Sequence, residues 1–280
     1  MSSYAYFNGK FGKKEDIAIP LSDRSIYFGD AIYEVAIGCY DRIMWEADHL
    51  ERLMKSCERA KIDHNYDKKH LSSLLREIAV RSMLESYLIY LQISRDMPVR
   101  KHSAVGSKAN LLVTIEPIEI PEKEEAMKLI TFPDLRYSYC DIKATNLLPA
   151  VLASTEAEKR GYDEAIFIKE NNITEGAKSN ILIIKQGRVI TPPLSRQILP
   201  GITRAHLLAI CKEENIPSEE REISLDELYT ADEVLVTSTT KLCRRASLVN
   251  FTSVGGKDPE LADLLRRRLY QDYLSCRKPE

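Results

Sequence analysis

The alternation of apolar and polar residues predicts mixed strands and helices over the first 118 residues. Aromatic residues alternate around Asn8-Gly9, a pair that favours a tight turn between antiparallel strands. Residues 31–45 are rich in β-forming side chains and predict two strands joined near Tyr40-Asp41. Apolar residues recur every three or four positions over 47–60 and 67–84, which predicts two helices. The apolar runs at 87–94 and 109–118 predict two further strands.

A charged segment with two prolines follows at 116–126 and predicts an exposed crossing between domains 1–118 and 123–280. A solvated loop within one domain would give the same composition. Beyond it we expect strands at 128–133, 135–142, 164–168, 173–185, 188–192 and 233–240. Helices are expected at 147–160 with Asn146 as N-cap, after Pro200, and at 258–275. The whole pattern predicts an α+β fold in two sub-domains.

The composition argues against several classes of protein but does not indicate a function. The 280 residues are 44% apolar and 29% charged, and a net charge of −2 gives no general affinity for nucleic acid or anionic membrane. No apolar run approaches the ~18 residues that span a bilayer, and the N-terminus has no secretion signal. The six cysteines are widely spaced, which favours reduced thiols in a cytoplasmic protein. The histidines show no metal-ligand spacing, so no metal is expected.

Two single residues raise the question of chemistry. Lys143 stands between Asp141 and Asn146, where it is either a charge at an element boundary or an amine held for reaction. Glu175 precedes Gly176 in a strand-like segment. It is either an exposed turn residue or a carboxylate that faces a heterocyclic nitrogen and keeps it protonated.

Four other groups could bind anions. PGITR (200–204) opens a helix whose free N–H groups suit a phosphate, and TSTT (237–240) offers hydroxyls at a strand end. Arg52 could add a third phosphate contact, although each feature alone also fits a helix cap, a polar turn or a solvated arginine. Arg100 and His102, two residues apart, could meet one carboxylate from the same side or form an ordinary basic loop.

Taken in order, several segments resemble the motifs of the class IV, or fold-type IV, pyridoxal-phosphate aminotransferases. They are DRSIYFGDAIYEV (23–35), HLERL (49–53), DIKATNLL (141–148), ITEGAKSN (173–180), PGITR (200–204) and VTSTT (236–240). The resemblance implies a two-domain enzyme with a small N-terminal α/β domain and a larger C-terminal domain that has a barrel-like sheet and helices. It also implies pyridoxal 5'-phosphate as cofactor.

The resemblance assigns roles to residues. Lys143 would form the Schiff base and shuttle the Cα proton, and Glu175 would pair with the pyridine nitrogen. Arg136 would approach the phenolic oxygen of the ring. The phosphate would be held by five residues: Arg52, Ile202, Thr203, Ser238 and Thr239.

The substrate class rests on a different stretch. Arg100 and His102 resemble the pair with which D-amino acid aminotransferases hold the α-carboxylate, and Tyr33 fits the tyrosine that joins them. In that sub-family the pair comes from the neighbouring subunit, which implies a homodimer. The implied reaction is ping-pong transamination of D-alanine with 2-oxoglutarate to pyruvate and D-glutamate. The alternatives are an aminodeoxychorismate lyase, an L-branched-chain or (R)-amine transaminase, and a protein that binds the cofactor without turnover.

The chain departs from the sub-family pattern at three positions. Lys178 stands where a small hydroxyl residue is usual, Asp96 replaces a glycine, and Tyr137 replaces a larger aromatic residue. These departures affect the expected side-chain preference more than the expected reaction.

Overall fold

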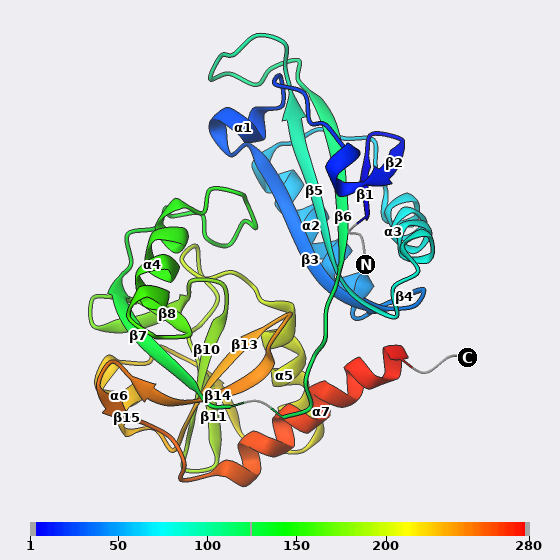
Figure 1. Ribbon diagram of the computed structural model, residues 1–280. Helices are drawn as coiled ribbons and strands as arrows, with labels where there is room; N and C mark the ends of the chain where they lie inside the picture. The colour runs from blue at the N-terminus through cyan, green and yellow to red at the C-terminus, as the bar shows by residue number, and fades with distance from the viewer. Residues whose placement is uncertain (1–3, 124, 278–280) are drawn as a thin grey trace. The chain divides into compact units, whose positions relative to one another are not determined.

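The computed structural model describes residues 4–123 and 125–277, and the chain divides into two compact units (Figure 1). The first unit comprises Met1–Glu119, Ile142–Asn146 and Tyr273–Glu280, and the second comprises Ile120–Asp141 and Leu147–Asp272. The chain first passes from one unit to the other within the charged segment at 116–126. It then returns briefly to the first unit, so the segment that carries Lys143 belongs to that unit.

The first unit is built on a six-stranded antiparallel sheet in the order β2-β1-β6-β5-β3-β4. The predicted turn at Asn8-Gly9 is confirmed, since both residues have positive φ (45° and 95°) between β1 and β2. The predicted join near Tyr40-Asp41 is confirmed between β3 and β4. The strands are β1 (Tyr4–Phe7), β2 (Lys10–Lys13), β3 (Ala31–Cys39), β4 (Arg42–Ile43), β5 (Ser86–Asp96) and β6 (Lys108–Pro117).

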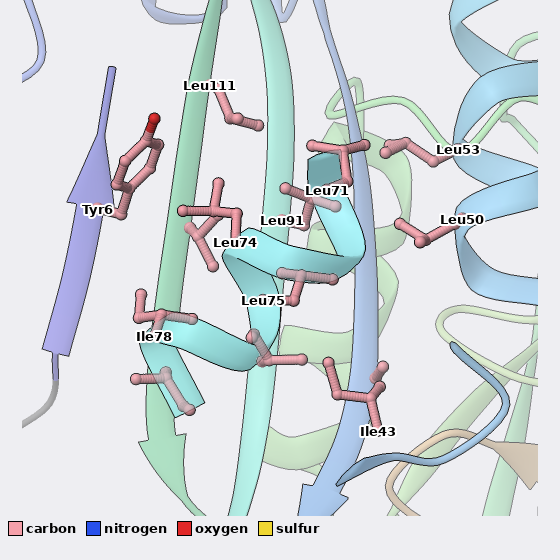
Figure 2. Close-up of a cluster of buried hydrophobic side chains, with 14 of the residues drawn as sticks. Tyr6, Ile43, Leu50, Leu53, Leu71, Leu74, Leu75, Ile78, Leu91 and Leu111 are labelled. Carbon is pink, nitrogen blue, oxygen red and sulfur yellow. The ribbon is translucent and has the colours of Figure 1, made fainter. Parts of the chain in front are cut away.

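Both predicted helices of the first unit are present and share one hydrophobic core with the sheet (Figure 2). Helix α2 (Glu46–Ala60) contributes Leu50 and Leu53, and α3 (Lys68–Ser82) contributes Leu71 and Leu74. Burial of each such side chain stabilises the fold by about 1.5–3 kcal/mol relative to exposure. A short helix α1 (Arg24–Phe28), which the apolar pattern did not predict, precedes β3.

The second unit contains a nine-stranded sheet of mixed direction. Its order is β12-β11-β10-β13-β14-β7-β8-β9, and β15 pairs with β14. Strand β9 ends this order, yet only three residues connect it to β10 near the other end, so the sheet curls on itself. The strands are β7 (Met127–Pro133), β8 (Glu164–Lys169), β9 (Asn172–Gly176), β10 (Asn180–Lys185), β11 (Arg188–Thr191), β12 (Ser218–Glu220), β13 (Glu233–Ser238), β14 (Leu242–Val249) and β15 (Thr252–Ser253).

Four helices accompany this sheet along the chain: α4 (Leu148–Lys159), α5 (Ile202–Glu213), α6 (Leu225–Thr230) and α7 (Pro259–Arg277). The predicted helices at 147–160, after Pro200 and at 258–275 are confirmed as α4, α5 and α7. Pro149 lies in the first turn of α4, where its missing N–H has no cost. The last residues of α7, from Tyr273, belong to the first unit.

Three sequence-based expectations are wrong. No strand covers 135–142, because the side chain of Arg136 binds that of Asp134, just before this stretch, and the backbone forms a turn at 138–141. Asn146 does not cap α4, since its Nδ2 donates to the carbonyl of Phe28 at 3.0 Å and Leu147 takes the cap position. The single strand expected at 173–185 is two strands, β9 and β10.

Candidate functional site

Lys143 lies in a short segment that pairs with the beginning of β3. The amide of Tyr33 donates to the carbonyl of Lys143 at 2.9 Å, and the amide of Thr145 donates to the carbonyl of Ala31 at 3.1 Å. Ala144, between them, forms an antiparallel bridge with Ile32. The backbone of Lys143 is therefore fixed by β-type hydrogen bonds, and its side chain starts from a defined position.

The side chain of Lys143 meets an aromatic ring. Its Nζ lies 4.4 Å from the centroid of the Tyr33 ring, which in turn stacks on Tyr90 with 5.5 Å between centroids. Among the residues that the structure describes, no carboxylate forms an ion pair with this amine. Consequently no salt bridge has to break before the amine reacts.

Arg52 is held by a buried carboxylate on the neighbouring strand. Its Nε and Nη2 donate to the two oxygens of Glu34, each at 2.7 Å, and Nδ1 of His49 lies 2.8 Å from Glu34 Oε2. Burial alone would raise the pKa of Glu34, but the charge of Arg52 and hydrogen bonds with Arg52 and His49 lower it to about 2. Glu34 is thus an anion that orients the Arg52 guanidinium.

Lys143 acts electrostatically on this buried cluster. Burial lowers the pKa of His49 below its ordinary value, and the positive charges of Arg52 and Lys143 lower it further, against the opposing effect of Glu34. His49 therefore tends to be neutral. The first unit thereby brings the predicted residues Lys143, Tyr33 and Arg52 into one neighbourhood.

Arg100 and His102 lie on the exposed loop between β5 and β6 and flank the same ring. The guanidinium carbon of Arg100 is 5.0 Å and the His102 ring 5.4 Å from the centroid of Phe28. Arg24, which is buried, donates to the carbonyl of His102 at 2.9 Å and to Asp30 at 2.7 Å. The loop is therefore anchored to α1, and a cavity of about 200 Å³ opens beside Arg100.

Asp96, one of the departures from the sub-family pattern, ends β5 where this loop begins. It pairs with Asp23 through an isolated antiparallel bridge, and its Oδ1 is buried without a hydrogen-bond partner within 4–123 and 125–277. Asp23 itself caps α1 by accepting from Ser25 N and also accepts from Ser94 at 2.6 Å. The base of the loop is thus built around two carboxylates.

Glu175 lies at the end of β9 in the second unit and is 5% exposed. Its Oε1 accepts from Arg136, and its Oε2 accepts from the amide of Leu199 at 2.9 Å and from Nδ2 of Asn180 at 3.1 Å. Burial would lower the pKa of Arg136, but the hydrogen bonds to Asp134 and the charges of Glu175 and Asp134 raise it. The permanent charge of Arg136 favours an ionised Glu175 carboxylate.

The predicted phosphate motif at 200–204 begins α5, a helix of 12 residues. Gly201 is the N-cap and provides no side-chain cap for the first N–H groups, which include those of Ile202 and Thr203. A Cβ at Gly201 would overlap Oδ1 of Asn180, so glycine is required by close approach. Because Asn180 also binds Glu175, one amide side chain fixes the helix start relative to the carboxylate.

Ser238 and Thr239 lie where β13 ends, at the same edge of the sheet. The β10–β13 pairing places Asn180 opposite Thr237, so Ser238 follows directly beside the Asn180 position. Ser238 Oγ accepts from the amide of Lys241 at 3.2 Å, and both hydroxyl residues are partly exposed. The second unit therefore groups Glu175, the start of α5 and two hydroxyls, which together can bind a phosphate and a protonated heterocycle.

Three residues that position the predicted ones were not singled out from the sequence: Glu34, Asn180 and Asp134. Glu34 and Asn180 occur inside the motifs at 23–35 and 173–180. Glu34 contacts side chains 15 or more positions away, and Asn180 contacts Glu175, five positions away, and the carbonyl of Leu199. Nothing in composition or periodicity reveals such contacts. Over the described residues, no three His, Cys, Asp or Glu side chains are arranged to hold a metal ion, and no helix could cross a membrane.

Comparison with known proteins gives consistent results. The family "Amino-transferase class IV" matches residues 32–249. A D-alanine aminotransferase of Bacillus licheniformis is 36% identical over 90% of this chain and 88% of its own. A D-alanine aminotransferase of Staphylococcus epidermidis is 34% identical over 96% of this chain and 95% of its own.

Solved structures share the fold. The branched-chain aminotransferase of Thermoproteus uzoniensis, solved with norvaline, has a TM-score of 0.89 at 25% identity and covers 99% of this chain and 97% of its own. A branched-chain amino acid aminotransferase of Thermobaculum terrenum, solved in its PLP form, has a TM-score of 0.84 at 20% identity. Its match covers 99% of this chain and 96% of its own, and it supports the fold alone.

Proposed function

Because the chain belongs to the class IV aminotransferases, we propose that it transfers the amino group of D-alanine to 2-oxoglutarate with pyridoxal phosphate as cofactor. The relatives named above as D-alanine aminotransferases support the substrate class. The observation that carries the proposed chemistry is Lys143, an amine with a fixed backbone and no carboxylate partner among the described residues. The products would be pyruvate and D-glutamate, formed in two ping-pong half-reactions.

The residues present fit the cofactor. When bound, pyridoxal phosphate supplies a carbon that takes up the amino group and a ring that withdraws electrons from the Cα of the amino acid. The N-terminus of α5 and the hydroxyls of Ser238 and Thr239 suit its phosphate, and the charge of Arg52 would attract it. We propose that Ile202 and Thr203 contribute their backbone N–H groups to this site.

Glu175 would bind the ring nitrogen of the cofactor, and Arg136 would position Glu175. Glu175 would accept a hydrogen bond from the protonated ring nitrogen, and Arg136, Asn180 and the Leu199 amide hold its carboxylate in place. Since Arg136 directs most of its donors to Glu175, Asp134, Thr174 and Gln197, its main role here is to fix the charge and position of Glu175. Its approach to the phenolic oxygen stays a prediction.

Lys143 would carry the proton. Its Nζ first takes the proton from Cα of the amino acid as a general base and then returns a proton as a general acid. The Tyr33 ring confines Nζ to one side and joins the substrate site. A base that acts from one fixed side favours one enantiomer, which accords with a D-specific reaction.

We infer that the active form is a homodimer in which Arg100 and His102 bind the α-carboxylate in the neighbouring subunit. Both residues are exposed on an anchored loop, and Val99 beside them is 68% exposed. In the second unit, α4 exposes Leu148, Val151 and Leu152 at 54–63%. A second copy of the chain would cover such apolar surface. The six free cysteines support a cytoplasmic location.

A paired assay tests the proposed function. D-alanine with 2-oxoglutarate should give pyruvate, whereas L-alanine and L-branched-chain amino acids should give little keto acid. Lys143→Ala should abolish turnover and the visible absorbance of the bound cofactor, because the attacking amine is lost. Activity confined to L-substrates would contradict the proposed substrate class. An active Lys143→Ala protein would contradict the proposed role of Lys143.

An L-branched-chain transaminase is the second candidate, because the similar solved structure from Thermoproteus uzoniensis is a branched-chain aminotransferase. Arg100 separates the two functions. Arg100→Ala should raise KM for D-alanine strongly without loss of cofactor if the residue binds the α-carboxylate. The same substitution should leave KM unchanged if the enzyme binds its substrate in another way.

A further inference from the structure

The turn between β9 and β10 carries an exposed lysine, Lys178. The turn is held at both ends, since the Gly176 amide donates to the carbonyl of Ser179 at 2.7 Å and the Ala177 amide donates to the carbonyl of Ala165 at 2.9 Å. A Cβ at Gly176 would overlap Oγ of Ser179, so the turn is also tightly packed. Lys178 therefore projects from a rigid base.

The turn lies at the edge of the sheet that carries the candidate phosphate groups. Asn180, the first residue of β10, pairs with Thr237 near the end of β13, so the turn before β10 lies at the end of the strand pair where Ser238 and Thr239 follow. Glu175, only three residues before Lys178, directs its carboxylate toward the start of α5. Lys178 thus belongs to the same neighbourhood as the groups proposed to bind cofactor and substrate.

Among the described residues of this unit, Lys178 differs from nearby cations because no acidic side chain pairs with it. Arg136 binds Asp134 and Glu175, and Lys241 binds Glu164 at 3.1 Å. In addition, Oγ of Ser179 is buried and has no hydrogen-bond partner within the described chain. The turn therefore offers a cation and a hydroxyl whose bonding capacity is unused.

We propose that Lys178 binds the second carboxylate of dicarboxylic substrates, such as 2-oxoglutarate and D-glutamate. This inference rests on the proposed function. A lysine suits the task because its flexible stem and three donors tolerate substrates of different length. Lys178 is then a specificity-determining residue that favours dicarboxylates over alanine and pyruvate.

The test compares Lys178→Ser with Lys169→Ser, a matched control. Lys169 is an exposed lysine at the end of β8, next to the turn that precedes β9, whereas Lys178 lies in the turn that follows β9. The ratio of kcat/KM for D-glutamate to that for D-alanine should fall about tenfold in Lys178→Ser, because a charge-assisted hydrogen bond is lost. Lys178→Glu should lower the ratio further, and Lys169→Ser should leave it unchanged.

Two binding measurements complete the test. The dissociation constant of glutarate, an unreactive dicarboxylate, should rise in Lys178→Ser, while that of pyridoxal phosphate should not. An unchanged selectivity ratio overturns the inference. A proportional loss for all substrates with weaker cofactor binding also overturns it, since Lys178 would then bind the phosphate. Wild-type inactivity on D-substrates would remove the proposed function instead, and glutarate binding would still test Lys178.

Discussion

At the scale of single residues, the charged groups of the site are oriented by buried partners. Glu34 serves Arg52 and His49 together, and Glu175 accepts from Arg136, Asn180 and a backbone amide. A buried charge that is paired in this way is costly to break, because removal of one partner leaves the other unpaired. The position of the Arg52 guanidinium, which we propose as a phosphate contact, thus depends on Glu34.

Glu34→Gln tests this dependence through pH. The shift of the Glu34 pKa from 4.5 to about 2 corresponds to roughly 3 kcal/mol of stability at neutral pH. Because the folded-state pKa is lowered, this stability is fully present above pH 4.5 and is lost as pH falls toward 2. The free energy of unfolding, from urea titrations, should therefore differ most between wild type and variant at pH 7.

The difference should shrink steadily as pH falls from about 4.5 toward 2, because the unfolded chain then binds a proton at Glu34 while the folded protein keeps this carboxylate ionised. Glu77→Gln is a suitable control, since Glu77 forms an exposed i,i+4 pair with Arg81 on α3. It should change the urea midpoint little at any pH. A Glu34→Gln deficit that is independent of pH would contradict the assignment of charge to Glu34.

At the scale of elements, the start of α5 is the most constrained part of the second unit. Gly201→Ala would place a Cβ against Oδ1 of Asn180 and displace either the helix start or the Asn180 side chain. Both movements disturb the proposed phosphate site, so the dissociation constant of pyridoxal phosphate should rise about tenfold. Absorbance titration of the apoenzyme measures this change.

Gly12→Ala provides the matching control. A Cβ at Gly12 would meet Ile17 and Asp16 at 3.7 and 3.8 Å, which are ordinary contacts, and Gly12 lies in β2 of the other unit. Its cofactor affinity should equal that of wild type. Unchanged affinity in Gly201→Ala would mean that α5 does not contribute to phosphate binding.

Helices and strands with strong periodicity could be predicted from sequence, whereas elements defined by distant partners could not. Helices α2 and α3 follow directly from apolar spacing. The stretch at 135–142 has β-forming tyrosines, yet Tyr137 and Tyr139 are exposed and the segment forms no ladder. Strand β14 was missed because Arg244 and Arg245 interrupt its apolar pattern, and α6 was missed because it has only six residues.

The segment after β6 depends on one arginine of α7. Arg266 donates to the carbonyls of Pro121 (2.8 Å) and Glu122 (2.7 Å) and to that of Cys243 (3.1 Å). Arg266→Ala removes these hydrogen bonds, so limited trypsin digestion should cut at the adjacent Lys123 about tenfold faster. Arg267→Ala, which alters an exposed neighbour, should digest at the wild-type rate. Equal rates in both variants would show that Arg266 does not restrain this segment.

At the scale of the whole molecule, each structural unit is built from segments that are not continuous along the chain. The motif that contains Lys143 follows the crossing segment in sequence, yet residues 142–146 belong to the first unit by their contacts. Periodicity could not predict this return, because it rests on two backbone hydrogen bonds with the start of β3 and a side-chain hydrogen bond from Asn146 to the carbonyl of Phe28. The family motifs predict Lys143 as the reactive residue, but only the structure assigns it to a unit.

The proposed homodimer makes a prediction about which chain completes each site. If Arg100 serves the neighbouring subunit, a heterodimer of Lys143→Ala and Arg100→Ala chains has one site with both residues intact. Purified through two different tags, it should show about half of wild-type activity per dimer, although each parent homodimer is nearly inactive. If Arg100 serves its own subunit, both sites of this heterodimer are damaged.

The reciprocal heterodimer reverses the expected result and controls for subunit exchange. It joins a wild-type chain to a chain with both Lys143→Ala and Arg100→Ala. With Arg100 acting on the neighbouring subunit, the intact Lys143 receives a defective partner loop, so activity at low D-alanine should be nearly lost. With Arg100 acting within its own chain, the wild-type chain keeps a complete site and about half of the activity remains. The two arrangements of Arg100 therefore give opposite outcomes in the two heterodimers. If only the heterodimer with a wild-type chain is active, Arg100 acts within its own subunit and the proposed carboxylate site shared between subunits is wrong.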